Sequence, residues 1–402
     1  MIRDKHYFHF KGKNAEEALA DLAYGSFLKD WCFPSPKNHK GKEICDLLVL
    51  FDNIAIVWQI KDLKLTKDEL VKEKHLEKNV RQAYGAEKAL LNEVAPISLE
   101  NTRRRIEKVD PKKIDEVFLI SCFMGQDPVL QHLVEQKGKN KRMVHIFNRS
   151  FTELVLSELD TIQDFTNYLR AKESLLLTKD SIVISGGEQE LLACYLKSNK
   201  SFDEFEVPQG LFIEEGLWTD FVNSQRYKNK LEANSVSYGW DEIIDRIHEG
   251  SENYEEIARH IARPTRFQRR GLAKTMLDAW IKAHKTPREK GDHYRRLLLE
   301  ESVTYVFLFV DEKLGREKRQ EMLRALCIIA RGVRQEKDPH VKEVIGIASE
   351  KEIKPTCSYD FLHYIVEEWT PQEQAQYEDF QRLIGAFKNV HWVKTTEHEY
   401  PD

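Results

Sequence analysis

Three polar residues lie in or beside two apolar runs in the first part of the chain. Asp46 belongs to the run ICDLLVLF (44–51), Gln59 belongs to the run IAIVWQI (54–60), and Lys61 follows directly. Asp-Asn separates the runs, which predicts a β-hairpin with a tight turn. Because side chains alternate along a strand, Gln59 and Lys61 point to the same face. A lysine that ends a buried apolar strand must be paired, reach solvent or serve a function.

These residue types can hold a divalent ion beside a phosphate. Mg²⁺ prefers oxygen ligands, which the Asp46 carboxylate, the Gln59 amide and the Ile60 backbone carbonyl could supply. Such an ion lowers the pKa of its bound water and offsets charge on the phosphate. Lys61 would position or help deprotonate that water and stabilise the transition state. The alternative is a solvated strand edge, where lysine is common.

An acid on one strand and Gln-x-Lys on the next resembles the PD-(D/E)xK nuclease superfamily. The resemblance is closest to its Mrr-like and NERD-like branches, in which Gln replaces the acid of the second motif. It spans roughly residues 10–92, in the order helix, hairpin, helix. It implies a mixed sheet with flanking helices and Mg²⁺-dependent cleavage, with Mn²⁺ as a possible substitute. Asp46, Gln59 and Lys61 would be catalytic, with a glutamate from the preceding helix. Cys45 stands where the family has proline.

Two glutamates of the helix predicted over 14–30 are candidates for that role. At about 100° per residue, the apolar face centres between Leu19 and Ala23. Glu16 borders this face, whereas Glu17 lies nearly opposite, toward solvent. We therefore expect Glu16 to reach the site, although both could be ordinary acids of a first helical turn.

The charged helix predicted over 68–92 offers contacts to a nucleic acid backbone. Lys78 and Gln82 are four residues apart, so they share a helical face with their neighbours Lys74 and Arg81. The face could equally be a solvated surface without a ligand.

A second basic surface is predicted in the middle of the chain. Residues 259–296 contain twelve basic and three acidic residues, a net charge of +9 in a chain of net charge −5. If a helix begins near Thr265, then Arg266, Arg270 and Lys274 form one ridge, which suits a phosphate backbone. The alternative is that acids elsewhere, including Glu367 and Glu368, pair with them.

The length of 402 residues predicts two to three domains, and 41% hydrophobic residues suffice for a core. We expect an α/β fold with α+β elements: a restriction-endonuclease-like domain (1–172), a largely helical basic region (173–298) and a small α/β domain (299–402). In the first domain we expect strands at 114–121 and 143–148, a helix over 150–172, and Asn14 as the N-cap of the helix over 14–30. In the last domain we expect strands at 303–310 and 341–349, and helices at 315–334 and after Thr370-Pro371. The acidic residues 397–402 are expected to be loose.

The expected function is that of a Mg²⁺-dependent DNA endonuclease in restriction, defence or repair, with RNA left open as a substrate. Six scattered cysteines without CxxC pairs, no apolar run of about 20 residues and a charged N-terminus favour the cytoplasm. A homodimer or higher homo-oligomer would let two sites face antiparallel strands. No GxxxxGK[ST] motif occurs, so any motor or effector would be a separate protein. The alternative is an inactive nuclease fold that binds nucleic acid or serves as a sensor or scaffold.

Overall fold

The computed structural model confirms a mixed α/β architecture. The structure describes residues 14–62, 72–93, 95–101, 107–125, 130, 132–138, 141–178, 181–203, 210–250, 254–286, 293–352, 357–388 and 397–401.

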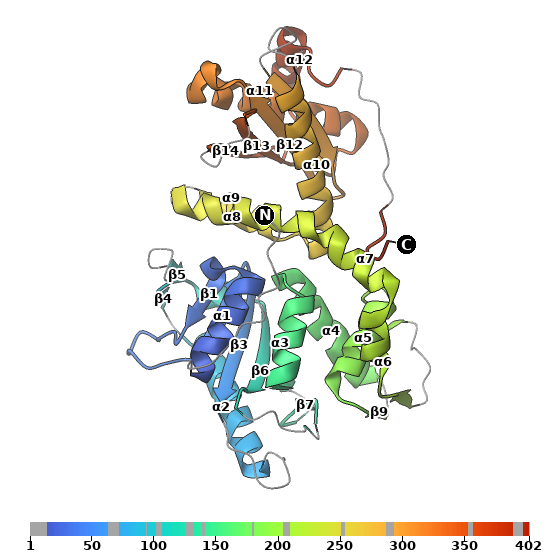
Figure 1. The fold of residues 1–402 in the computed structure, drawn as a ribbon. Coiled ribbons are helices and arrows are strands. Elements are labelled where there is room, and N and C mark those ends of the chain that lie inside the picture. The colour runs from blue at the N-terminus through green and yellow to red at the C-terminus, as the bar shows by residue number, and fades with distance from the viewer. Residues whose placement is uncertain are drawn as a thin grey trace.

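A six-stranded mixed sheet forms the first part of the molecule (Figure 1). Its strands lie in the order β1-β2-β3-β6-β8-β7. Their bounds are β1 Cys32–Pro34, β2 Leu47–Phe51, β3 Ile54–Lys61, β6 Glu116–Phe123, β7 Val134–Glu135 and β8 Val144–Asn148. β2 and β3 form the predicted hairpin, and Asp52 in its turn has a φ of 51°, a left-handed conformation that aspartate tolerates. The strands expected near 114–121 and 143–148 are confirmed as β6 and β8.

Helices cover both faces of this sheet, because β3 carries apolar side chains on each of its two faces. Trp58 and Ile60 pack with α1 (Ala15–Phe27), α3 (Arg149–Glu158) and α4 (Ile162–Thr178). Ala55 and Val57 point the other way and pack with α2 (Glu73–Leu91). β3 and β6 are parallel, so the chain must cross the sheet between them, and α2 lies in that crossover. Asn14 caps α1 as predicted by accepting the Glu17 backbone N–H at 2.8 Å.

The single helix expected over 150–172 is two helices in the structure. The break falls at residues 159–161, where the Thr161 hydroxyl accepts the Asp164 backbone N–H at 3.0 Å and starts α4. Threonine favours this capping role over a helix interior. Two further strands, β4 (Ile97–Leu99) and β5 (Glu107–Val109), form a separate antiparallel ribbon.

The middle of the chain is mainly helical (Figure 1). Its elements are β9 Ile182–Ile184, α5 Glu188–Lys197, β10 Leu211–Ile213, α6 Leu217–Asn223, α7 Gln225–Asn234, α8 Tyr238–Gly250, α9 Glu255–Ala262 and α10 Arg266–Lys285. Helices α8 and α9 lie between the first sheet and a second sheet, whereas α5, α6 and β9 lie beside the first sheet. Thr265 and Gln268 form a capping box, so α10 begins where the sequence predicts. The domain boundaries predicted at 172 and 298 fall inside α4 and β11.

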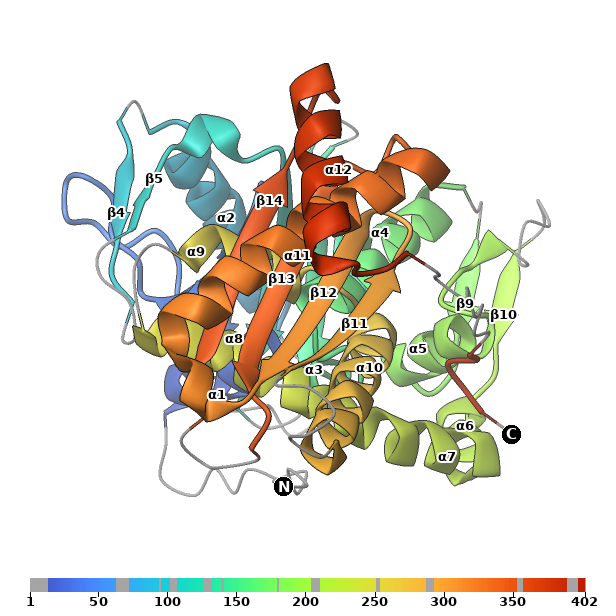
Figure 2. The same cartoon turned by 90° about the horizontal axis from the view of Figure 1, so that it is seen from above.

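A second, four-stranded sheet has the order β11-β12-β13-β14. Its bounds are β11 His293–Leu299, β12 Val303–Val310, β13 Glu343–Glu350 and β14 Tyr359–Ile365, with α11 Gly315–Lys337 and α12 Pro371–Ile384. α11 links the parallel strands β12 and β13 and covers one face together with α12 (Figure 2). α8 and α10 pack on the opposite face, where Trp240 contacts Tyr305 and Trp280 stacks on Phe309. The predicted strands and helices of this part are confirmed, whereas β11 and β14 were not predicted.

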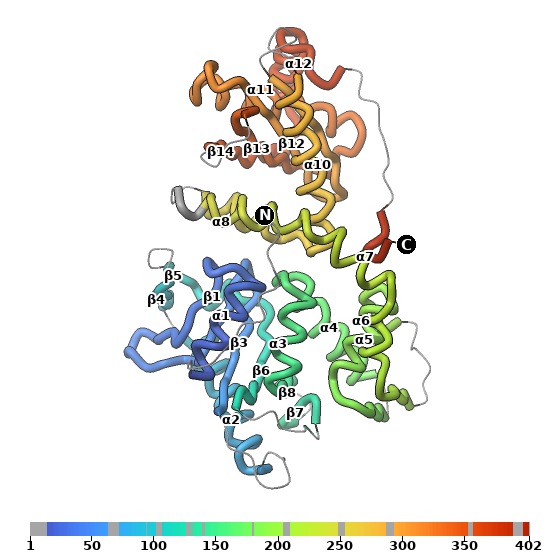
Figure 3. Tube along the Cα trace, in the orientation of Figure 1, coloured from blue at the N-terminus to red at the C-terminus, as the bar shows by residue number. Residues whose placement is uncertain are grey.

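Residues 397–401 are held in place, contrary to the prediction that they are loose. They run beside α7 (Figure 3). The Glu399 carboxylate pairs with Lys200 at 2.7 Å, and the Arg270 guanidinium donates to the His398 carbonyl at 2.7 Å. Tyr400 packs edge-on against Phe221. We call residues 397–401 the strap, because they lie across the middle helices and contact Lys200, Phe221 and Arg270.

Candidate active site

The hairpin brings Asp46 and Gln59 together at the end where β2 begins. Because Leu47 pairs with Trp58 in antiparallel register, Asp46 lies opposite Gln59. The Ile60 backbone N–H donates to Asp46 Oδ2 at 2.5 Å, which fixes the carboxylate against β3. A carboxylate held by a backbone N–H is oriented before any ligand arrives.

Gln59 and Lys61 point toward the face that α2 covers, because Trp58 and Ile60 belong to the opposite core cluster. The Gln59 side chain is buried, whereas Lys61 is half-buried at the end of β3. Asn79 of α2 donates to the Gln59 carbonyl at 3.3 Å and to the Ser121 hydroxyl at 2.6 Å, which ties this helix to the site strands. In the part of the chain that the structure describes, Lys61 forms no ion pair.

Glu43 is a further acid at this position that the sequence analysis missed. Burial raises the pKa of Glu43, and the negative charges of Asp46 and Glu16 raise it further, together with a hydrogen bond to Asp46. Glu16 therefore lies close enough to this loop for its charge to act on Glu43. That Glu16 reaches an ion at Asp46 stays a prediction. The only sequence signal for Glu43 was an acid three residues before Asp46.

The donor set suits a hard divalent cation in chemistry and in charge. Carboxylate and amide oxygens are what Mg²⁺ and Mn²⁺ prefer. Burial is the main cause of the raised pKa of Glu43, and the charges of Asp46 and Glu16, which add to it, are ones that a cation would offset. Glu43 and Asp46 share a hydrogen bond, but the carboxylates of Glu16, Glu43 and Asp46 do not all lie within 4.8 Å of one another. Among the described residues, the group that meets this condition is Glu256, His260 and His363. Waters would therefore complete the coordination shell of an ion bound at Asp46, as is usual for Mg²⁺.

The predicted contacts on α2 have the exposure that such a role needs. Lys78 and Gln82 are exposed, together with Lys74 and Arg81. Their buried neighbours Val80 and Ala83 hold the helix on the sheet. This surface remains a prediction for nucleic acid contact.

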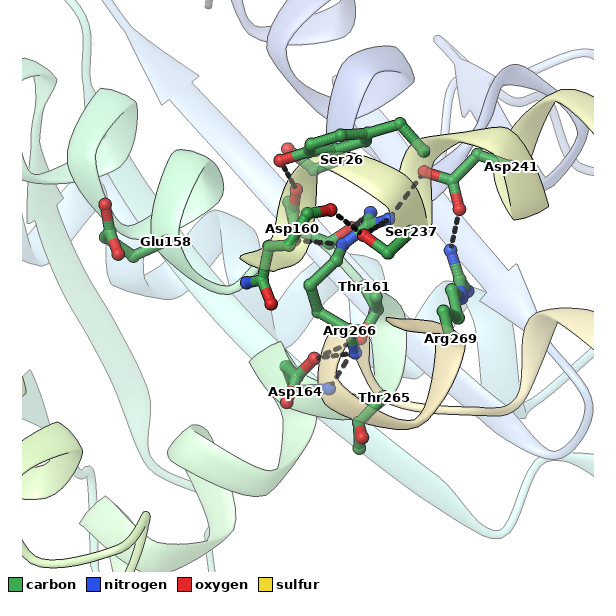
Figure 4. Close-up of polar contacts among 12 residues, drawn as sticks. Ser26, Glu158, Asp160, Thr161, Asp164, Ser237, Asp241, Thr265, Arg266 and Arg269 are labelled. Atoms are coloured by element: carbon green, nitrogen blue, oxygen red, sulfur yellow. Dashed lines mark hydrogen bonds and ion pairs between the residues drawn. The ribbon is translucent and has the colours of Figure 1, made fainter. Parts of the chain in front are cut away.

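The prediction of an exposed basic ridge on α10 is wrong, because two of its three residues are buried. Arg266 is 4% exposed and Arg270 is 3% exposed. Arg266 Nε donates to Asp160 at 2.8 Å, and its Nη1 donates to Asp241 at 2.8 Å (Figure 4). Arg270 donates to backbone carbonyls of the strap, and Lys274 pairs with Glu397 at 2.9 Å.

These arginines instead hold the first part of the chain to the middle helices. Asp241 accepts from both Arg266 and Arg269 at 2.8 Å. Burial alone would raise the pKa of Asp241, but the two guanidinium groups lower it below its usual value. The Arg266 backbone N–H donates to Asp164 at 2.7 Å, so α10 is also anchored on α4. The alternative of acidic partners was right, although the partners are not Glu367 and Glu368.

Comparison with known proteins gives one partial similarity. The chain is similar to the transport protein particle subunit trs120 of Schizosaccharomyces pombe, with 25% identity over 167 residues. This segment covers 40% of the chain and only 13% of trs120. No protein-family model matches, and no solved structure matches. None of the helices in the described ranges is long and apolar enough to cross a membrane.

Proposed function

We propose that the chain is a metal-dependent nuclease that hydrolyses phosphodiester bonds of DNA with Mg²⁺ or Mn²⁺. The observation that carries this proposal is that Asp46, Gln59 and Lys61 lie together at one end of the β2–β3 hairpin. Glu16 and Glu43 lie nearby, because the charges of Asp46 and Glu16 both raise the pKa of Glu43. The same constellation first suggested the resemblance to PD-(D/E)xK nucleases, and the element order α1, β2, β3, α2 fits it.

The residues would divide the work as follows. Asp46, Gln59 and the Ile60 carbonyl hold the ion, which supplies a water of lowered pKa. Lys61 holds the attacking water and neutralises charge on the phosphate oxygens. The water oxygen would form a bond to phosphorus while the bond to the leaving oxygen breaks. The water proton would pass to solvent, and the leaving oxygen would take a proton from solvent. Lys78 and Gln82 would contact the backbone of the bound strand.

Nicking of supercoiled plasmid tests the chemistry. We expect wild-type cleavage with Mg²⁺ or Mn²⁺ and none with EDTA. Lys61→Ala should lower the rate by about 100-fold or more, because its charge acts on the transition state. Lys113→Ala is the matched control, because Lys113 is an exposed lysine far from the hairpin end. Equal nicking by wild type and Lys61→Ala would overturn the proposal.

Metal titration tests the ion site separately. Asp46→Asn should weaken Mg²⁺ or Mn²⁺ binding, because it removes the only charged ligand of the predicted set. Gln59→Glu should strengthen binding, because it adds a second carboxylate. Circular dichroism of each variant checks that the fold is intact. Unchanged affinity in Asp46→Asn would place the ion elsewhere.

A second candidate is an assembly role without catalysis. The matched relative is named as a subunit of a particle, and this chain exposes two apolar residues that face each other across the β9–β10 pair. Val183 is 57% exposed and Phe212 is 63% exposed. Sedimentation of wild type and Phe212→Ser would test this role: loss of an oligomer without loss of fold, in a protein that does not nick DNA, would favour it.

A further inference from the structure

Two histidines and two glutamates meet where α9 lies beneath the second sheet, far from Asp46. Glu256 and His260 are four residues apart on α9, so they share one face of the helix. His363 lies on β14 opposite Ile345 of β13, and Glu343 lies two residues from Ile345 on the same side of the sheet. The β13–β14 pair and the helix thus present their polar side chains to a common point.

One carboxylate, Glu343, binds both imidazole rings. Its Oε1 lies 2.5 Å from His260 Nδ1 and 2.9 Å from His363 Nε2. The two ring centroids are 4.1 Å apart. When each ring donates one N–H to Glu343, the other nitrogen of each ring keeps its lone pair. His260 Nε2 and His363 Nδ1 can then each bind a metal ion.

The third donor comes from Glu256, whose carboxylate lies 3.7 Å from His363 Nδ1. One ligand atom from each of Glu256, His260 and His363 lies within 4.8 Å of the others. Ligand atoms around a tetrahedral Zn²⁺ are about 3.3 Å apart, given bonds of about 2.0–2.1 Å. The group therefore needs only a small contraction to surround an ion.

We propose that Glu256, His260 and His363 form a Zn²⁺ site that joins α9 to the second sheet. Imidazole nitrogen with one carboxylate oxygen is a donor set that zinc uses, and the fourth position would hold water. Glu343 orients both rings from outside the ligand shell, the usual arrangement for zinc-binding histidines. With Glu343 included, two carboxylates and two neutral rings balance the charge of the ion.

Arg263 places a positive charge beside His260 Nε2, the proposed ligand atom, and so opposes the binding of a cation there. It cannot donate to His260 Nδ1 while that nitrogen donates to Glu343. Its Nη1 lies 2.7 Å from His260 Nδ1 and 3.4 Å from His260 Nε2. The Arg263 Nε also donates to Asp52 at 2.7 Å, and the side chain is 46% exposed, so it has a partner and room when it turns away. Zinc binding should therefore move Arg263 toward Asp52, and removal of the guanidinium should strengthen binding.

Calorimetric titration of Zn²⁺ into the EDTA-stripped full chain tests the site, together with the zinc-induced rise in melting temperature. We expect one zinc-dependent event in wild type that is lost in His260→Gln and in His363→Gln. Glu343→Gln should weaken it by about 10- to 100-fold, and Arg263→Gln should strengthen it. His284→Gln is the control, because His284 is an exposed histidine on α10 outside the cluster.

Each variant is compared with its own zinc-free melt, because loss of a ring also removes a hydrogen bond to Glu343. Asp46→Asn must leave zinc binding unchanged, which separates this site from the proposed nuclease centre. Absence of binding in wild type would overturn the proposal. Equal binding in the double variant His260→Gln/His363→Gln would also overturn it, since the ion would then lie elsewhere.

Discussion

Replacing Arg266 and Lys274 separately by glutamine distinguishes a buried structural cation from an exposed one on the same helix. Both residues lie on α10 and were predicted to share a basic ridge. Arg266 is 4% exposed and pairs with Asp160 and Asp241, whereas the Lys274 side chain is 57% exposed and pairs with Glu397. The two variants change the same charge in the same element, so burial is the main difference between them.

The expected costs follow from that difference. Arg266→Gln leaves Asp160 without its arginine and Asp241 with only Arg269, and it removes a guanidinium that stacks 4.4 Å from the ring of Tyr238. Breaking a buried ion pair in this way costs about 3–5 kcal/mol of unfolding free energy. Lys274→Gln loses an exposed pair, which is worth about 0.2–1 kcal/mol.

Urea unfolding followed by circular dichroism measures both losses. With a slope of about 3 kcal/mol/M, Arg266→Gln should lower the midpoint by about 1–1.7 M, and Lys274→Gln by about 0.3 M or less. The salt dependence of DNA binding should be the same in Arg266→Gln as in wild type, because a buried guanidinium releases no counterion. Equal midpoints for the two variants, or a shallower salt slope in Arg266→Gln, would refute this reasoning.

Two further predictions concern pH and packing. Burial would raise the pKa of Asp164, but Lys200 and the Arg266 backbone N–H lower it from 3.8 to about 2. The stability that this carboxylate contributes, on the order of 2 kcal/mol, is therefore present above pH 4 and lost as the pH falls from 4 to 2. Melting curves should show that Asp164→Asn is less stable than wild type at pH 7 and loses less stability between pH 4 and 2. An equal loss of stability in wild type and variant over this range would contradict the assignment. A methyl group at Gly332 would overlap the ring of Tyr377, so Gly332→Ala should lower the free energy of unfolding by about 1–3 kcal/mol. Gly85 has open space around it, so Gly85→Ala should raise the free energy of unfolding by about 0.5–1 kcal/mol. Denaturant unfolding of both alanine variants measures this contrast, and a stable Gly332→Ala would contradict it.

The features predicted correctly depend on residues that are close in sequence. Asn14 and Thr265 predicted the starts of α1 and α10, because a helix cap is set within three residues. The Asp-Asn turn predicted the β2–β3 hairpin, and its register then placed Asp46 beside Gln59. Alternation along a strand and periodicity along a helix suffice for such local geometry.

The features predicted wrongly or missed depend on partners far along the chain. Helical periodicity showed that Arg266 shares a face with Lys274, but it carries no information on Asp160, which lies 106 residues from Arg266. His260 and His363 come from a helix and a strand. The pairing of β13 with β14 brings Glu343 to His363, and the packing of α9 on this sheet brings His260 to the same carboxylate. Glu43 lies in a loop, where no periodicity indicates its direction.

The strap imposes an order of events on the synthesis of the protein. Lys200 and Arg270 are translated well before Glu399, which follows Lys200 by about 200 residues and so emerges about 10–40 s later at roughly 5–20 residues per second. During this interval the Arg270 guanidinium lacks the carbonyl groups of His398 and Glu399, and Phe221 lacks the ring of Tyr400. Asp164 and Asn234 are made early enough to pair with Lys200 and Arg270 in a nascent chain. Until residues 397–401 are made, however, these two cations lack their remaining partners and Phe221 stays uncovered by Tyr400.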